Sequence, residues 1–299
     1  MKIVIAGGSG FIGKKLTEVL LSAGHEVAIL TRRAKQVNGK VTYVKWLEEG
    51  VFPEREIGNP DAIINLAGVS INDGRWTENH QKEIYDSRMN ATNELIRIIT
   101  ALPEKPATFI NASAIGIYPA SLDAVYTEDS LEKANDFLAR TVDDWETKAA
   151  SVEMLGIRAI YMRFGVVLGI DSGALPLMVL PYKLFAGGTV GSGEQWVSWV
   201  HVADVARAIS FALENDALRG PVNVTSPSPK KMNDFGKTIG AVLDRPHWLP
   251  VPSFAMKLAL GDKSALVLEG QHVIPQALTA NGFEFKFPTL ESALEDLLQ

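Results

Sequence analysis

The sequence has no cysteine in 299 residues, which excludes disulfide bonds, thiol catalysis and cysteine-ligated metal sites. Its five histidines are scattered and form no HExxH or similar pair, so we expect no metal site. The net charge of −6 offers no basic surface for nucleic acid or for an anionic membrane. No apolar run approaches the roughly 20 residues needed to span a bilayer. These absences make a small molecule the expected partner, and they leave a homodimer open.

What the chain does have is an ordinary globular composition, with 46% hydrophobic and 21% charged residues. Its length is sufficient for a large core and for one or two domains. The first residues form a strand pattern rather than a signal peptide, so we expect a cytoplasmic location.

A strand, a glycine-rich turn and a helix follow one another at the N-terminus. Lys2–Ala6 is a short apolar, β-branched run typical of a buried parallel strand, and Phe11–Ala23 has helical spacing. The glycines between them fit both G-x-G-x-x-G and G-x-x-G-x-x-G, which allow a tight turn and let the backbone approach a pyrophosphate at the helix N-terminus. A glycine-rich turn that binds nothing is the alternative. The predicted cofactor-binding residues of this turn are Gly7, Gly8, Ser9, Gly10, Phe11, Ile12 and Gly13.

The end of the second predicted strand, Glu26–Leu30, bears on which dinucleotide is bound. A site for NAD needs a carboxylate here, about 20 residues after the glycines, to hold the ribose 2′-hydroxyl. Thr31, Arg32 and Arg33 stand there instead, and guanidinium groups suit a 2′-phosphate through charge and forked hydrogen bonds. We therefore expect binding of NADP in preference to NAD, with solvated loop arginines as the alternative.

Strands and helices alternate through the first half of the chain, which predicts an α/β fold with a doubly wound parallel sheet of the Rossmann type and a smaller C-terminal substrate lobe. The regularity breaks after Gly165, and Gly187–Val197 is expected to form a cleft loop. We predict an NAD(P)-binding domain over residues 1–240, with substrate-lobe insertions from about 165, and a small C-terminal domain over residues 245–299. Further strands are predicted at Val41–Lys45, Ala62–Leu66, Thr108–Ala112 and Ile157–Arg163, and helices at Thr77–Ala101, Asp136–Met154 and Thr289–Leu298.

Three motifs resemble those of the extended short-chain dehydrogenase/reductase superfamily, and the resemblance covers nearly the whole chain. They are the glycine turn Gly7–Gly13, the segment Asp61–Gly68, and Gly191-x-Gly193-x-Gln195 running into His201–Ala206. Shorter pieces resemble an atypical group of that superfamily, the epimerase family proteins, which have a small C-terminal domain. These pieces are Arg75–Thr77, Ser87–Arg88, Ser113–Tyr118, Asp144–Glu146, Gly165–Gly169, Gln195–His201, Arg245–Pro246 and Pro250–Pro252.

The resemblance implies further cofactor-binding residues. It places Leu66, Ala67 and Gly68 along the adenine–ribose side of the dinucleotide. Arg88 stands where many relatives carry an asparagine, so the resemblance implies that its side chain points into the cleft as a further cofactor-binding residue. A buried or surface ion pair is the alternative for Arg88.

The sequence departs from the superfamily at its reactive Tyr-x-x-x-Lys pair. Those two positions, at the start of the helix after the fifth strand, hold Phe137 and Thr141, which cannot serve as the usual acid and base. Ala114 replaces the usual serine or threonine of the fifth strand. Val197 replaces the arginine with which nucleotide-sugar epimerases hold a diphosphate.

Weak catalytic candidates remain in Ser113 and Tyr118, although a strand-end serine bonded to the backbone is an equal alternative for Ser113. For Glu146 and Lys148, on a predicted helix, we expect a solvated surface. The sequence therefore predicts an atypical NADP-dependent oxidoreductase or epimerase-like enzyme acting on an unknown small substrate. The alternative is a non-catalytic regulatory protein that senses NADP(H).

Overall fold

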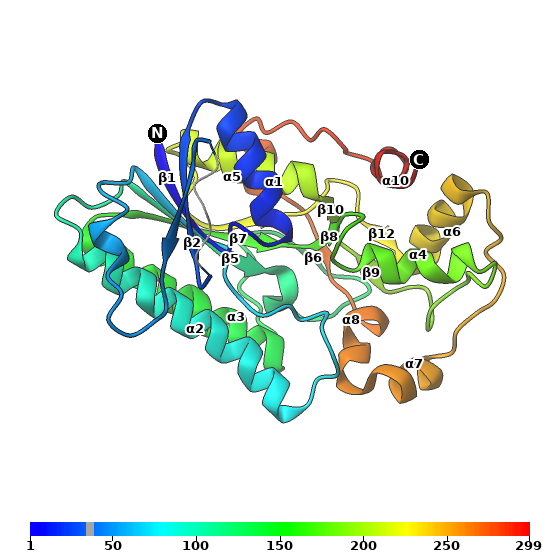
Figure 1. The fold of residues 1–299 in the computed structure, drawn as a ribbon. Coiled ribbons are helices and arrows are strands. Elements are labelled where there is room, and N and C mark those ends of the chain that lie inside the picture. The colour runs from blue at the N-terminus through cyan, green and yellow to red at the C-terminus, as the bar shows by residue number, and fades with distance from the viewer. Residues whose placement is uncertain (34–38) are drawn as a thin grey trace.

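The computed structural model describes residues 1–33 and 39–299. Within these residues, seven parallel strands form the central sheet in the order β11-β7-β5-β4-β1-β2-β3 (Figure 1). This order, with β1 in the interior and neighbours added outward on both sides, is that of a doubly wound fold. The strands are β1 (Lys2–Ala6), β2 (Glu26–Thr31), β3 (Val41–Lys45), β4 (Ala62–Asn65), β5 (Thr108–Ala114), β7 (Arg158–Phe164) and β11 (Gly220–Val224).

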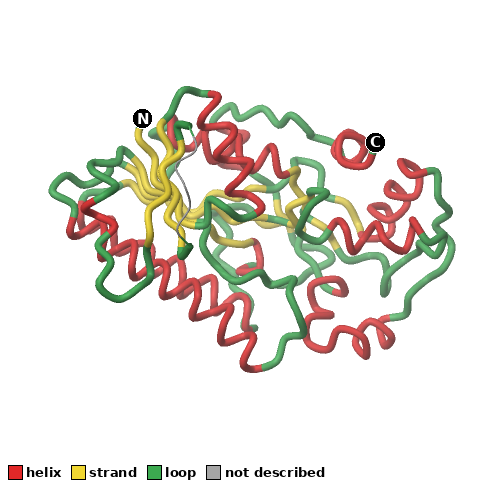
Figure 2. Tube along the Cα trace, viewed as in Figure 1, coloured by secondary structure: helices red, strands yellow, loops and turns green. Residues whose placement is uncertain are grey.

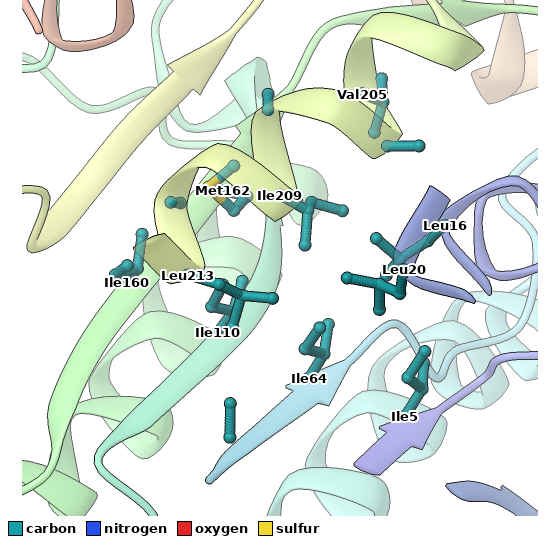
Figure 3. Close-up of a cluster of buried hydrophobic side chains, with 14 of the residues drawn as sticks. Ile5, Leu16, Leu20, Ile64, Ile110, Ile160, Met162, Val205, Ile209 and Leu213 are labelled. Atoms are coloured by element: carbon teal, nitrogen blue, oxygen red, sulfur yellow. The ribbon is translucent and has the colours of Figure 1, made fainter. Parts of the chain in front are cut away.

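The sheet separates two layers of helices. One face is covered by α2 (Glu78–Ala101) and α3 (Phe137–Ala150), and the other by α1 (Phe11–Ser22) and α5 (Val202–Glu214) (Figure 1). Because both faces are buried, the central strands β1, β2 and β4 are nearly continuous apolar runs rather than alternating ones. Figure 3 shows the interface with α1 and α5, which is built from Ile5, Ile64, Ile110, Ile160, Leu16, Leu20, Ile209 and Leu213.

The predicted fold class is confirmed, and the predicted elements differ from the observed ones only at their ends. β5 runs to Ala114, and the helix predicted to reach Met154 ends at Ala150 and continues as a 3₁₀ turn. The starts of α2 and α3 have a physical cause, because Thr77 and Asp136 each cap their helix by accepting the N–H of the residue three positions further on.

A second core lies beside the sheet (Figure 2). Tyr182 of α4 (Leu175–Lys183), Trp199 of β10 (Trp199–His201), Phe235 of α6 (Met232–Leu243) and Leu294 of α10 (Leu290–Leu298) pack together there. Two short strand pairs connect this core to the sheet, β8 (Val166–Leu168) with β10 and β9 (Trp196–Val197) with β12 (Lys230–Lys231). The insertions predicted from about residue 165 supply most of these elements.

The C-terminal segment returns to the first half of the chain before it ends. After α7 (Ser253–Leu260) and α8 (Ala265–Leu268), β13 (His272–Val273) pairs in parallel with β6 (Val125–Tyr126). α9 (Gln276–Ala280) then packs against β11. The predicted domain boundary between residues 240 and 245 stays a prediction.

The described residues contain neither a membrane-spanning helix nor a cluster of metal ligands. None of their helices combines the length and the hydropathy needed to cross a membrane. In the same part of the chain, no three His, Asp or Glu side chains gather closely enough to hold a metal ion.

Candidate cofactor site and active site

The glycine turn between β1 and α1 is packed too tightly for side chains at two positions. Gly7 has φ +81°, and a Cβ on it would lie 2.5 Å from the carbonyl oxygen of Leu66. A Cβ on Gly13 would lie 2.6 Å from Gly8 Cα and collide with the oxygen of Gly7. These glycines therefore bring the start of α1 directly against the ends of β1 and β4.

Gly10 differs from these two glycines because the space beside it is open. An added Cβ there would meet, among the described residues, only the oxygen of Gly7, at 3.2 Å. Gly10 is also the N-cap of α1, whose first-turn N–H groups have no partner within the helix. An open space at a helix N-terminus fits the pyrophosphate of a dinucleotide. Phe11 contributes its backbone here, since its ring packs against Gly169, where a Cβ would lie 2.5 Å from Cε2.

The end of β2 lies next to this turn, because Ala6 of β1 pairs with Leu30 of β2. The hydroxyl of Thr31 accepts the N–H of Arg33 at 3.2 Å and donates to its carbonyl at 3.1 Å, which turns the chain out of the sheet. Arg32 and Arg33 are both exposed, and within residues 1–33 and 39–299 neither guanidinium forms an ion pair. The loop that follows includes residues outside the described part of the chain.

The end of β4 is the third segment at this site, beside the glycine turn and the end of β2. The N–H of Leu66 donates to the oxygen of Ala6 at 2.8 Å, and a Cβ on Gly7 would lie 2.9 Å from the nitrogen of Ala67. Gly68 follows beside Arg88, whose Cζ would lie 3.2 Å from a Cβ on this glycine. The structure thus brings together the segments for which cofactor roles were predicted separately.

Arg88 projects from α2 and is half-buried. Its Nη1 donates to the carbonyl oxygens of Val69 at 3.2 Å and Ile84 at 2.9 Å, and its Cζ lies 5.1 Å from the ring centre of Trp145. Burial lowers the pKa of Arg88 to about 10, so the side chain is still charged at neutral pH. Among the described residues, Arg88 forms neither of the alternatives, a buried ion pair or a surface ion pair.

A buried polar network lies at the ends of β5 and β7. Ser113 donates to Glu146 Oε1 at 2.5 Å. Arg163 donates to the same carboxylate twice, from Nε to Oε1 at 2.8 Å and from Nη2 to Oε2 at 2.7 Å. Arg163 Nη1 also donates to the hydroxyl of Tyr118 at 2.8 Å, and that hydroxyl lies 2.9 Å from Asn223 Oδ1. The network joins α3 to three strands or strand ends of the sheet.

The expectation that Glu146 lies on a solvated surface was wrong, because Glu146 is only 8% exposed. Glu146 falls on the same helix face as Val142 and Ala149, which are buried against the sheet. Lys148, two residues on, points to solvent as expected. The one sequence signal for the buried pair was Arg163, a charged residue within an apolar strand that requires a partner.

The two catalytic candidates lie inside this network. Tyr118 is 1% exposed, and burial raises the pKa of its hydroxyl even though Arg163 lies beside it. Ser113 is also buried, and its hydroxyl bonds to a carboxylate rather than to the backbone. Direct proton transfer to a substrate by either residue stays a prediction, and these positions favour a role in holding the ends of β5 and β7.

The segment that replaces the superfamily's reactive pair has local structural roles. Asp136 Oδ1 accepts the N–H of Ala139 at 2.8 Å, and the hydroxyl of Thr141 donates to the carbonyl of Phe137 at 2.8 Å. The ring of Phe137 meets the ring of Trp76 edge-on, with centres 6.0 Å apart. These contacts engage the side chains of Asp136 and Thr141 in helix capping and in a backbone hydrogen bond.

Residues 3–225 match the NAD dependent epimerase/dehydratase family, and residues 251–297 match a domain of unknown function, DUF1731. The chain belongs to the NAD dependent epimerase/dehydratase family. It is 51% identical to the epimerase family protein YfhF of Bacillus subtilis, covering 100% of this chain and 98% of that protein. It is 41% identical to the epimerase family protein SH2119 of Staphylococcus haemolyticus, covering 99% of each. The resemblance to the epimerase family proteins is thereby confirmed.

Solved structures agree with this membership. The human epimerase family protein SDR39U1 with NADPH superposes with a TM-score of 0.87, at 35% identity over 99% of each chain. A nucleoside-diphosphate sugar epimerase from Corynebacterium glutamicum gives 0.79, at 28% identity over 100% of this chain and 58% of that one. MoeE5 in complex with UDP-glucose and NAD also gives 0.79, but at 19% identity it shows the fold alone.

Proposed function

We propose that the chain binds NADP(H) and acts as an oxidoreductase or epimerase-like enzyme on a small substrate, without a Tyr-x-x-x-Lys pair. The observation that carries the proposal is the meeting of the glycine turn, the two exposed arginines after β2 and the end of β4 at one edge of the sheet. The space at Gly10 suits a pyrophosphate, and Arg32 and Arg33 suit a 2′-phosphate. The NADPH of the human relative supports the same cofactor here.

The nicotinamide of a bound dinucleotide supplies hydride transfer, and the residues of this chain bind and orient it. Phe137 and Thr141 cannot supply the accompanying proton, since one has no titratable group and the other is bonded to the backbone. Glu146 and Tyr118 are enclosed with their partners. We therefore propose that a water held with the substrate exchanges the proton.

Calorimetric titration with NADPH and NADH tests the cofactor assignment. The Arg32→Ala/Arg33→Ala variant should lose about 1.5–3 kcal/mol of NADPH binding while its affinity for NADH stays the same. Arg55→Ala is the matched control, because Arg55 is an exposed arginine elsewhere that rests on the ring of Phe52. Equal affinity of the wild-type protein for the two cofactors would contradict the assignment.

A second function, sensing of NADP(H) without turnover, is favoured by the two residues at the positions of the reactive pair. The hydroxyl of Thr141 is bonded to the backbone, and Phe137 has a ring without a titratable group. The two functions are separated by mixing the protein with NADPH and a library of small carbonyl compounds and following the absorbance of NADPH. Protein-dependent oxidation of NADPH with any of these compounds supports the enzymatic function. Tight NADPH binding without oxidation across the library supports the sensor.

A further inference from the structure

We propose that Arg88 binds an anionic group of the substrate, and that the substrate is therefore a small carboxylate or phosphate compound. The proposal rests on the proposed NADP(H) function, because it assigns a substrate to the same site. The guanidinium of Arg88 has more hydrogen-bond donors than the described residues use.

Arg88 leaves two of its three nitrogens without a protein partner. Nη1 donates to two carbonyl oxygens, whereas Nε and Nη2 form no hydrogen bond within residues 1–33 and 39–299. Neither nitrogen is among the fully enclosed unpaired atoms of those residues, so both retain access to solvent. A guanidinium with Nε and Nη2 free presents the two adjacent donors that bind a carboxylate or a phosphate in a forked manner.

The absence of an acidic partner sets Arg88 apart from other enclosed arginines. Arg163 is paired with Glu146, and Arg158 lies 3.5 Å from Asp216 and donates to several carbonyl oxygens. Arg88 is held between the ring of Trp145 and Gly68, with no carboxylate among its partners in the described part of the chain. Removing a cation from water without pairing it is costly, and a bound anion would offset that cost.

The cofactor's own anionic groups already have other binding elements. The pyrophosphate fits the N-terminus of α1 at Gly10, and the 2′-phosphate fits Arg32 and Arg33 after β2. Arg88 lies on a different element, α2, behind the end of β4 and against α3. Its free donors are therefore left for an anion that the substrate brings.

Gly68 makes the guanidinium approachable. A Cβ at this position would lie 3.2 Å from Arg88 Cζ and 3.3 Å from Nη1, closer than ordinary van der Waals contact. Glycine at this position therefore adds no side-chain atom beside the guanidinium. The Gly68→Ala variant should accordingly weaken anion binding, even though it leaves the charge in place.

Calorimetric titration of the NADP⁺-saturated protein tests the proposal. The probes are inorganic phosphate, acetate and benzoate, with benzamide as the neutral match for benzoate. We expect the wild-type protein to bind at least one anion and to prefer benzoate over benzamide. Arg88→Gln should weaken the binding of that anion by at least about tenfold, which corresponds to the lower end of the energies of charge-assisted hydrogen bonds. Its affinity for NADPH should change by less than about threefold, and Arg55→Gln should change neither.

Three outcomes would overturn the proposal. One is that no probe binds the NADP⁺-saturated wild-type protein. Another is that Arg88→Gln binds the anions as well as the wild type does. The third is that Arg88→Gln loses about tenfold or more in NADPH affinity, which would assign Arg88 to a cofactor phosphate and leave the proposed function standing.

Two further measurements keep the test decisive. If Arg88→Gln does not fold, Arg88→Lys retains the charge but not the fork, and it should bind the same anion several times more weakly. Unchanged affinity in Arg88→Lys would contradict the forked contact. If the wild-type protein binds no NADPH, the proposed function fails. The same anion titrations on the protein without cofactor then decide on Arg88 alone.

Discussion

The guanidinium of Arg163 is bonded in a bidentate manner to the carboxylate of Glu146, and both side chains are about nine-tenths buried. This pair connects β7 to α3 beside the end of β5. Ser113 and Tyr118 bond to its two ends, so that the ends of β5 and β7 are held by one network.

Breaking this pair should destabilise the protein strongly. Glu146→Gln leaves the guanidinium of Arg163 buried without a counter-charge, so we expect the free energy of unfolding to fall by about 3–5 kcal/mol. The measurement is urea denaturation followed by circular dichroism. The control is Lys148→Gln on the exposed face of the same helix, which should change the value by less than about 0.5 kcal/mol. Similar values for the two variants would show that the pair does not stabilise the fold.

Gly10 and Gly13 of the glycine turn should respond differently to the same substitution. Gly13→Ala places a Cβ against the backbone of Gly7 and Gly8, so both the melting temperature and cofactor affinity should drop. Gly10→Ala meets only the oxygen of Gly7 at 3.2 Å and fills the space for the pyrophosphate. It should lose cofactor affinity with little loss of stability. Thermal melts with and without NADPH compare them, and an unchanged NADPH-induced shift in Gly10→Ala would place the cofactor elsewhere.

The stability of the substrate lobe should depend on pH through His247. The hydroxyl of Tyr182 lies 2.8 Å from its Nδ1 and Asn233 Oδ1 lies 3.0 Å from its Nε2. Burial, with Lys237 nearby, lowers the pKa of His247. The neutral ring is therefore favoured in the folded state, and its contribution is complete above the ordinary pKa of about 6.5 and is lost as the pH falls below it.

We accordingly expect the free energy of unfolding to decrease between about pH 7 and about pH 5, because the unfolded chain binds more protons. His247→Gln should make that decrease smaller. Urea denaturation at the two pH values measures it. An identical pH dependence in the wild type and the variant would show that His247 does not titrate with unfolding.

Asp136 should behave as a helix cap and not as a catalytic acid. Asp136→Ala removes the acceptor for the N–H of Ala139 and should cost about 0.5–2 kcal/mol of stability, whereas Asp136→Asn keeps an acceptor and should cost less. Once a substrate is known, Asp136→Asn should retain kcat. A loss of kcat by about 100-fold or more in Asp136→Asn, at unchanged stability, would identify Asp136 as an acid or base.

The sheet and the cofactor segments could be predicted because their signals are local. The apolar run Lys2–Ala6, the glycines after it and the helical spacing of Phe11–Ala23 lie within one stretch of chain. The caps Thr77 and Asp136 likewise act within three residues of their own position. In each case the physical cause is contained in the segment that shows the pattern.

The buried network and the return of the chain at β13 could not be predicted in the same way. Glu146 and Arg163 meet only because α3 and β7 pack together. The residue pattern of the helix does not identify Arg163 as a partner, and the pattern of the strand does not identify Glu146. β13 and β6 pair over two residues each, too few for any periodicity to show. Contacts between segments distant in the sequence decide both features.

A calorimetric comparison of two cofactor fragments tests directly whether this chain selects NADP(H) through Arg32 and Arg33. Adenosine 2′,5′-bisphosphate and adenosine 5′-monophosphate differ only in the 2′-phosphate. We expect the wild-type protein to bind the bisphosphate at least about tenfold more tightly, and this difference to be lost in Arg32→Ala/Arg33→Ala. Equal affinities of the wild-type protein for the two fragments would contradict it.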